Sequence, residues 1–318
     1  MEVNQQTVKV GVIGAGVMGT NHARIFSEME NVVLAGIYDQ EYSNALLVAK
    51  KNGCKAFHSL GELLNSDIDA VSIAVPTSSH KPVALAAIEK GKHVLLEKPI
   101  AGTIADAEEI INAARDAKVI LMIGHVERFN PVVNKIKELI AEEDIISISF
   151  KRVGPLPPRI KDAGVIIDLG IHDIDLARYL TGEDIEEVYC VTSKNVAKYE
   201  DSSNILLRTI TGKSIQITTN WVTPFKLRQV EVITKKKLLI CNLITQQITE
   251  YSNYSSQDSS YIVRDIMVKY DEPLKREFNA FTDSIRNNED AVVTGNDGLE
   301  SLKIAVYATR QTTIHNKE

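Results

Sequence analysis

The first part of the chain alternates short apolar runs with segments of helical periodicity. The runs are rich in Val, Ile and Leu and lie at 8–13, 32–39, 70–76, 93–99 and 119–125. Helices are expected between them, from Met18 onward and at 42–51, 82–90 and 107–114. Apolar β-branched runs separated by helices are typical of a parallel sheet that is covered on both faces. The pattern predicts an α/β domain with a doubly wound parallel sheet over residues 1–124.

Beyond residue 124 the pattern of apolar positions changes. A helix is expected after Pro131, where apolar residues recur at helical spacing. Apolar and polar residues then alternate at 146–150 and 213–221, and short apolar runs follow at 229–234 and 238–244. Alternation favours strands with one buried face, so antiparallel pairing is expected.

The last part of the chain completes this second domain. The segment 251–260, rich in Ser, Tyr and Asn, is expected to be a loop or a tolerant edge, and two amphipathic helices follow it. We therefore predict a second α+β domain over residues 125–318. Its closing helices, within 275–318, are expected to pack back on the first domain.

Length, charge and cysteine content narrow the classes of function. A chain of 318 residues suits two domains. Its formal net charge of -6 gives no overall attraction for nucleic acid or an anionic membrane. Three cysteines without a CxxC pair, no export signal and no run of 18 apolar residues favour the cytoplasm. A small-molecule ligand is therefore expected, with no nucleic-acid or membrane partner.

A glycine-rich turn follows the first predicted strand directly. Gly14, Gly16 and Gly19 form a GxGxxG pattern with Ala15, Val17 and Met18 between them, and a helix follows. In this setting the glycines allow a tight turn, the approach of a pyrophosphate, and close packing of helix on strand. We predict a dinucleotide site.

Other candidate cofactor contacts lie at the ends of later strands. Asp39 ends the second strand, where a carboxylate can bind a ribose diol and repel a 2′-phosphate, so NAD is favoured over NADP. Pro76, Thr77 and His80 follow the third long strand at the edge of the sheet where such folds bind ligands. For His80, a role at a helix N-terminus is an open alternative.

Two further groups of residues carry candidate chemistry. Glu97 and Lys98 follow the strand at 93–96, so they lie at the same edge of the sheet and are candidate cofactor contacts near the nicotinamide. Lys98 can also orient a substrate hydroxyl there. Asp168 and His172 are four residues apart, which places them on one face of a helical turn. Histidine suits a proton that leaves and returns near neutral pH.

These motifs resemble the glucose-fructose oxidoreductase, inositol dehydrogenase and rhizopine-catabolism family, written Gfo/Idh/MocA. The resemblance covers nearly the whole chain, and its specific residues are Glu97-Lys98-Pro99 and the DxGxH pattern of Asp168 to His172. It implies a Rossmann domain, a second domain with a mainly antiparallel open sheet, and a homo-oligomer. It also implies that Lys98 and His172 are the catalytic pair assisted by Asp168, that the Lys98–Pro99 peptide is cis, and that NAD takes a hydride from a sugar or polyol carbon.

Within that family, the segment 124–131 resembles the nucleotide-sugar branch, in particular UDP-N-acetylglucosamine 3-dehydrogenases. Substrate contacts are accordingly expected from Lys98, His125, Arg128, Asn130, Arg159, Asp168 and His172. Arg128 is expected either to bind a diphosphate or to form a structural ion pair. Lys151 and Arg152 are expected at the surface or, alternatively, as further cations for the ligand.

The sequence leaves two questions open, the roles of the aspartates near His172 and the type of reaction. Asp173 and Asp175 are interpreted as a helix N-terminal residue and a residue near the substrate, and no metal site is expected because one histidine and a few carboxylates are not a closed ligand set. The family also contains inositol, free-sugar and dihydrodiol dehydrogenases. A nicotinamide-binding sensor without catalysis is the candidate from a different functional class.

Overall fold

The computed structural model describes residues 7–141, 143–157 and 163–310. They form two compact units, which we describe separately. One unit holds the chain up to His125 together with Leu274–Glu300, and the other holds Val126–Pro273 together with the chain from Ser301. The closing segment is thus divided between the units.

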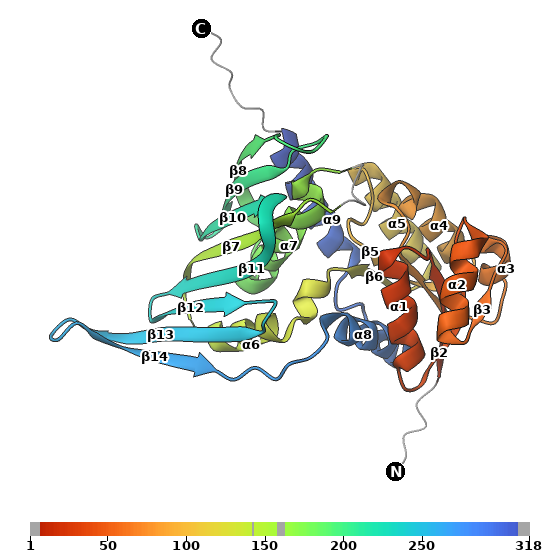
Figure 1. Cartoon of the computed structure of the whole chain (residues 1–318), viewed down its shortest axis with the longest axis horizontal. Helices are drawn as coiled ribbons and strands as arrows, with labels where there is room; N and C mark the ends of the chain where they lie inside the picture. Colours follow the sequence, from red (N-terminus) through yellow and green to blue (C-terminus); the bar gives the residue numbers. More distant parts are fainter. Residues whose placement is uncertain (1–6, 142, 158–162, 311–318) are drawn as a thin grey trace, which may run out of the picture. The chain divides into compact units, whose positions relative to one another are not determined.

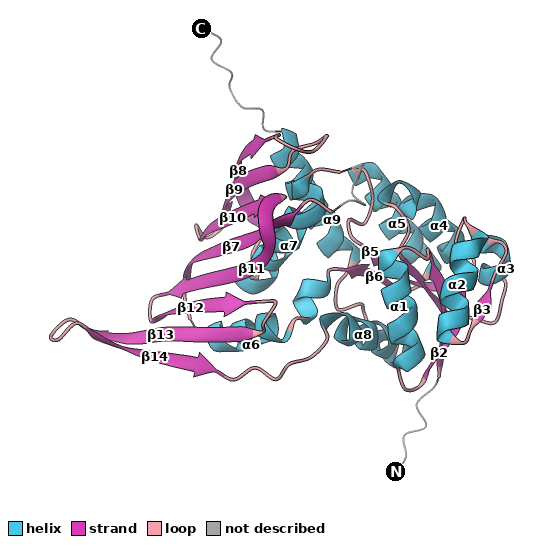
Figure 2. Cartoon of the chain, viewed as in Figure 1, coloured by secondary structure: helices cyan, strands magenta, loops and turns pink. Residues whose placement is uncertain are grey.

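The first unit contains a six-stranded sheet flanked by helices (Figures 1 and 2). Its strands are β1 (Val8–Ile13), β2 (Val32–Tyr38), β3 (Lys55–Ala56), β4 (Ala70–Ile73), β5 (His93–Glu97) and β6 (Leu121–Gly124). Its helices are α1 (Val17–Glu28), α2 (Tyr42–Asn52), α3 (Leu60–Leu64), η1 (Thr77–Ser79), α4 (His80–Glu89), α5 (Ile104–Ala117) and α8 (Pro273–Asn287).

The strand order of this sheet is β3-β2-β1-β4-β5-β6, and every neighbouring pair is parallel. That is the order of a dinucleotide-binding doubly wound sheet, which reverses direction next to β1. Helices α1 and α2 pack together, as do α4 and α5. The predicted fold of the first domain is confirmed.

The second unit is built around a sheet of eight strands (Figure 2). Its strands are β7 (Ile145–Pro155), β8 (Ile185–Ser193), β9 (Ser202–Thr209), β10 (Ser214–Asn220), β11 (Val222–Thr234), β12 (Lys237–Asn242), β13 (Gln247–Ser255) and β14 (Ser260–Ile266). Its helical segments are η2 (Val126–Phe129), α6 (Pro131–Ile140), the π-helical turn η3 (Ile166–Gly170), α7 (Ile171–Thr181) and the later turns of α9 (Gly295–Arg310).

The sheet of the second unit is mixed rather than wholly antiparallel. Its order is β14-β13-β12-β11-β7-β10-β9-β8, and β10 runs parallel to β7, with Ile215 opposite Ile148. The other neighbouring pairs are antiparallel, so the prediction of a mainly antiparallel sheet is confirmed. The one parallel pair was not predicted, because alternation of apolar residues reveals a buried face but not the direction of the neighbouring strand. The segment 251–260 comprises the end of β13, the turn at 256–259 and the first residue of β14, in the hairpin at the edge of the sheet (Figure 1).

One face of this sheet packs on helices and forms the core. Ile148, Phe150 and Val230 of the strands are fully or almost fully buried together with Ile136 of α6 and Ile174 of α7. None of the helices within the described ranges is long and apolar enough to cross a membrane.

Candidate active site

The glycine turn after β1 has the shape that a dinucleotide requires. Gly14 has φ +98°, and a Cβ there would lie 2.6 Å from the carbonyl oxygen of Ala74. A Cβ on Gly19 would lie 1.8 Å from the carbonyl oxygen of Gly14, so only glycine lets α1 pack this closely. At Gly16, the N-cap of α1, a Cβ would meet no atom within 4 Å, which leaves its backbone open to a phosphate. These residues fit NAD.

Asp39 holds this turn in place. Its Oδ2 accepts a hydrogen bond of 2.7 Å from the backbone N–H of Ala15, and its Oδ1 accepts one of 2.9 Å from Glu41. The side chain is half-buried at the end of β2. Val17 is exposed and Met18 is half-buried at the start of α1, so this end of the helix is accessible. Contact between Asp39 and a ribose stays a prediction.

Of the three residues after β4 that were predicted to contact the cofactor, two are accessible and one is buried. Pro76 is exposed and Thr77 is half-buried at the start of η1. His80 is only 1% exposed, and its Nδ1 and Nε2 lie 2.8 and 3.1 Å from the carbonyl oxygens of Pro99 and Val75. Both ring nitrogens therefore face the protein backbone, and His80 is the first residue of α4. The alternative of a position at a helix N-terminus thus fits His80 better than the expected cofactor contact.

Glu97 belongs to a buried chain of hydrogen bonds behind Lys98. His22 Nε2 lies 3.1 Å from Glu97 Oε1, and its Nδ1 lies 2.7 Å from Ser72 Oγ. Glu97 Oε2 accepts a hydrogen bond of 3.1 Å from the backbone N–H of Lys98. Burial alone would raise the pKa of Glu97, but the hydrogen bond and charge of His22 and the charge of Lys98 lower it. Glu97 thus orients the Lys98 turn, and its contact with the cofactor stays a prediction.

Lys98 itself is half-buried directly after β5. The Lys98–Pro99 peptide is cis, as the family resemblance implied.

In the second unit, Asp168 and His172 lie on consecutive turns of one continuous helical segment. Asp168 is buried in the π-helical turn η3, and His172 is half-buried in the first turn of α7. The sequence predicted an ordinary α-helical turn here, but the structure has a π-helical turn, which is wider. Such π turns occur frequently at functional sites.

Arg128 forms the buried ion pair that was one of its two expected roles. Its Nε and Nη2 donate to Asp175 Oδ2 and Oδ1 at 2.8 and 2.7 Å. The side chains are 6% and 1% exposed. The alternative in which Arg128 binds a diphosphate is therefore not supported by its geometry, and Asp175 is correspondingly a partner of Arg128 rather than a residue facing substrate.

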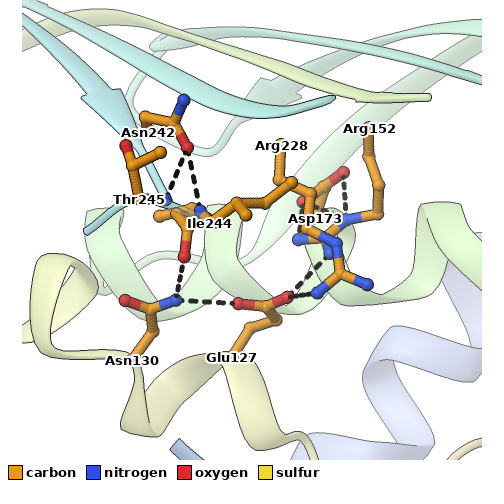
Figure 3. Close-up of polar contacts among 9 residues, drawn as sticks. Glu127, Asn130, Arg152, Asp173, Arg228, Asn242, Ile244 and Thr245 are labelled. Carbon is orange, nitrogen blue, oxygen red and sulfur yellow. Dashed lines mark hydrogen bonds and ion pairs between the residues drawn. The ribbon is translucent and has the colours of Figure 1, made fainter. Parts of the chain in front are cut away.

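A second cluster joins η2, α7 and two strands, and Figure 3 shows its contacts. Arg152 of β7 donates to Asp173 from Nε at 3.0 Å and from Nη2 at 2.8 Å, and to Glu127 Oε1 from Nη1 at 2.8 Å. Arg228 of β11 donates from Nη1 to the same Glu127 oxygen at 2.9 Å. Burial alone would raise the pKa of Glu127, but the charges of Arg152 and Arg228 lower it.

This cluster corrects two expectations. Arg152 is 2% exposed, so it is neither a surface charge nor a cation open to a ligand, whereas its neighbour Lys151 is exposed. Asp173 does lie in the first turn of α7, but its carboxylate is the partner of Arg152.

The remaining predicted substrate residues have other surroundings. Asn130 caps α6 by accepting from the backbone N–H of Val132 at 3.1 Å, and its Nδ2 donates to the carbonyl oxygen of Leu243 at 3.0 Å (Figure 3). It therefore joins α6 to the turn after β12, which corrects the expected substrate contact. His125 is buried directly after β6. Arg159 lies outside the described residues.

Sequence reasoning missed the roles of Glu127, Arg228 and His22. A signal for the arginines was present, because side chains two apart on a strand share a face. Arg152 continues the buried series of Ile148 and Phe150, and Arg228 precedes Val230 in the same way. The pattern thus placed two cations on an inward face. Nothing comparable in the sequence joined His22 to Glu97, which is 75 residues away.

Together, an NAD-binding sheet and a second unit that carries an Asp–His helical segment define a two-domain nicotinamide-dependent oxidoreductase. The chain belongs to the Gfo/Idh/MocA oxidoreductase family. Residues 8–125 match its NAD-binding Rossmann-fold domain, and residues 134–240 match its C-terminal domain. Its relatives are named dehydrogenases, and this protein is an NAD-dependent dehydrogenase that acts on CH–OH groups.

Two relatives illustrate the range of the family. The chain is 36% identical to UDP-N-acetylglucosamine 3-dehydrogenase of Acidithiobacillus ferrooxidans over 58% of each chain. The solved structure of that enzyme matches 95% of this chain and 96% of its own with a TM-score of 0.89, at 26% identity. The chain is also 30% identical to inositol 2-dehydrogenase of Rubrobacter xylanophilus over 71% of this chain and 68% of that one.

Proposed function

We propose that the protein oxidises C3 of UDP-N-acetylglucosamine with NAD. The observation that supports this most is the likeness to a UDP-N-acetylglucosamine 3-dehydrogenase, which extends over 95% of the chain in structure. The resemblance of the segment 124–131 to the nucleotide-sugar branch agrees with it.

The chemistry follows from the residue types and their surroundings. His172 takes the proton of the substrate hydroxyl, and Lys98 donates a hydrogen bond to the same oxygen, which stabilises the negative charge that develops on it. Asp168, four residues before His172, assists it, as the family resemblance implies. The Glu97–His22–Ser72 chain fixes the backbone from which Lys98 extends. NAD, held by the glycine turn and Asp39, would supply the hydride acceptor for the sugar carbon when bound.

A panel of substrates tests this proposal. UDP-N-acetylglucosamine, its uronic acid, glucose, myo-inositol and a dihydrodiol are each incubated with NAD, and absorbance of the reduced nicotinamide is recorded. We expect turnover of UDP-N-acetylglucosamine, with a 3-keto product found by mass spectrometry. Turnover of free polyols alone would contradict it.

Oxidation of a free polyol such as inositol is the second candidate. It is supported by inositol 2-dehydrogenase relatives, one of which, from Thermotoga maritima, is 26% identical over 96% of both chains. In that case myo-inositol gives the highest kcat/KM in the panel.

The catalytic roles are tested by substitution. Lys98→Ala and His172→Ala each remove a group that acts on the hydroxyl, so we expect kcat to fall by about 100-fold or more. NADH affinity, measured by fluorescence titration, should change little. Exposed Lys151→Ala serves as a control with unchanged kcat. Normal turnover by both variants would show that the roles are wrongly assigned.

A further inference from the structure

Two arginines stand directly opposite each other on neighbouring strands of the second unit. In the antiparallel pair β7–β11, Arg228 is the partner of Arg152. Each arginine lies two residues from a buried residue of its own strand, Phe150 in β7 and Val230 in β11. Their side chains therefore lie on the same, inward face of the sheet. Like charges directly opposite on one face repel, and the arrangement is stable only with anions nearby.

The anions within the cluster are divided unequally between the two arginines. Arg152 holds Asp173 with two of its nitrogens and Glu127 with a third. Arg228 shares that same Glu127 oxygen through Nη1. Among the described residues no second carboxylate bonds to Arg228, although the charge of Asp173 also acts on it. A guanidinium carries five N–H donors, so most of the donor capacity of Arg228 is left for another acceptor.

Arg228 is also the most exposed residue of the cluster. The side chains of Arg152, Glu127 and Asp173 are 3%, 6% and 2% exposed, whereas that of Arg228 is 41% exposed. Burial and the charge of Arg152 lower the pKa of Arg228, and the opposing charges of Glu127 and Asp173 do not fully compensate. An anion arriving from solvent would offset this repulsion, and Arg228 is the member of the cluster that it can reach.

Glu127 fixes the direction of the Arg228 side chain. Its other oxygen accepts a hydrogen bond of 3.3 Å from Asn130, the cap of α6, so the carboxylate is held on both sides (Figure 3). A guanidinium held at one nitrogen loses less conformational entropy when it binds a ligand, and its planar edge suits two oxygens of one phosphate. Asp173 in this cluster directly follows His172 along α7.

We propose that Arg228 binds the phosphate group of a phosphorylated sugar substrate, the role that the sequence had offered to Arg128. This rests on the proposed function insofar as it concerns a sugar substrate. The phosphate belongs either to a sugar diphosphate or to a sugar monophosphate, and these share the chemistry that Arg228 recognises.

Calorimetric titration of the NAD-loaded protein tests this without depending on turnover. UDP, glucose 6-phosphate and N-acetylglucosamine are the probes. The variants are Arg228→Gln, Arg228→Lys, and Lys226→Gln as a matched control that removes an exposed cation from the same strand. Arg228→Gln leaves Glu127 paired with Arg152, so the fold is expected to persist, and circular dichroism checks it.

We expect Arg228→Gln to raise the Kd of the phosphorylated probe by about tenfold or more, since charged hydrogen bonds are lost. The Kd of Arg228→Lys should lie between those of the wild type and Arg228→Gln, because lysine keeps the charge but lacks the planar edge of the guanidinium. Lys226→Gln should change the Kd less than about twofold, and binding of uncharged N-acetylglucosamine should be the same in all variants. Tighter binding of UDP than of glucose 6-phosphate would identify a diphosphate, and the reverse a monophosphate.

Equal affinity of the wild type and Arg228→Gln for both phosphorylated probes would overturn the proposal, as would failure of the wild type to bind either one. Failure of the proposed function has a different signature. In that case UDP-N-acetylglucosamine is not oxidised, yet the dependence of phosphate binding on Arg228 remains.

Discussion

At the scale of single residues, Asp39 stabilises the glycine turn and is predicted to favour NAD over NADP. Its carboxylate accepts backbone hydrogen bonds from Ala15 and Glu41, which fixes the glycine turn. Each carboxylate oxygen has two lone pairs, so capacity remains for a ribose diol. Its negative charge also opposes a 2′-phosphate.

Asp39→Ala should therefore weaken NADH binding and reduce the preference for NADH over NADPH. Titration by nicotinamide fluorescence measures both affinities. Glu41→Ala is the matched control, because Glu41 contributes its backbone N–H and not its side chain to this contact. Equal or reversed affinities of the unchanged protein for the two cofactors would refute the role given to Asp39.

Glu277 is a second residue whose environment leads to a measurable effect. It is 1% exposed on α8, and burial, together with the negative charge of Glu97, raises its pKa well above the ordinary value. A carboxyl group whose pKa is higher in the folded state favours folding below its ordinary pKa of 4.5. That contribution is lost as the pH rises toward the folded pKa.

Glu277→Gln removes this dependence, because the amide carries no charge at any of these pH values. We expect the variant to raise Tm relative to wild type more at pH 8 than at pH 5, measured by differential scanning calorimetry. Exposed Glu289→Gln should give the same small difference at both pH values. A gain for Glu277→Gln that does not grow with pH would mean that burial does not hold this carboxyl protonated.

At the scale of elements, local pattern predicted five of the six strands of the first sheet but not the strand pairing of the second. Strands β1, β2, β4, β5 and β6 coincide with the five apolar runs, and each βα unit follows the previous one along the chain. Strand β3 was not predicted, because its two residues, Lys55 and Ala56, form no apolar run. In the second unit β7 pairs with both β10 and β11, which are distant in sequence, and a period of two cannot distinguish a parallel from an antiparallel partner.

The same limit applies to the candidate site. Lys98, Asp168 and His172 were predicted because the motif itself carries their chemistry. Whether Arg128 forms an internal ion pair or binds a ligand depends on Asp175. Asp175 is 47 residues away in the sequence and is brought to Arg128 by packing of η2 against α7. Short-range pattern cannot choose between an internal carboxylate and an external phosphate as the partner of an arginine.

The buried cluster ties β7 to η2 and α7, so its loss should destabilise the second unit. Arg152→Ala leaves Asp173 buried without its ion-pair partner, and removing one member of such a pair costs about 3–5 kcal/mol. Urea denaturation followed by fluorescence of Trp221 measures this, because Trp221 is the one tryptophan of the chain and is buried in the core of that unit.

Lys151→Ala, the exposed neighbour on the same strand, should change the free energy of unfolding by less than about 0.5 kcal/mol. If Arg152→Ala were as stable as Lys151→Ala, the cluster would contribute nothing to the stability of the unit.

At the scale of the whole molecule, the chain combines an NAD-binding unit with a unit that carries the proposed proton acceptor. Neither unit contains both Lys98 and His172. Strands β8 and β9 of the second sheet expose the apolar side chains of Tyr189, Val191 and Leu206, and Tyr189 lies opposite Leu206. Exposed apolar side chains that lie together are typical of interaction surfaces. The homo-oligomer stays a prediction.

Direct transfer of hydride from the sugar to NAD is tested most directly by isotope labelling. UDP-N-acetylglucosamine deuterated at C3 is incubated with the protein and NAD, and the reduced cofactor is isolated and analysed by mass spectrometry and NMR. We predict one deuterium atom at C4 of the nicotinamide, equal in amount to the 3-keto sugar formed. Reduced cofactor without deuterium, or a ketone at C3 without reduced cofactor, would contradict transfer from that carbon.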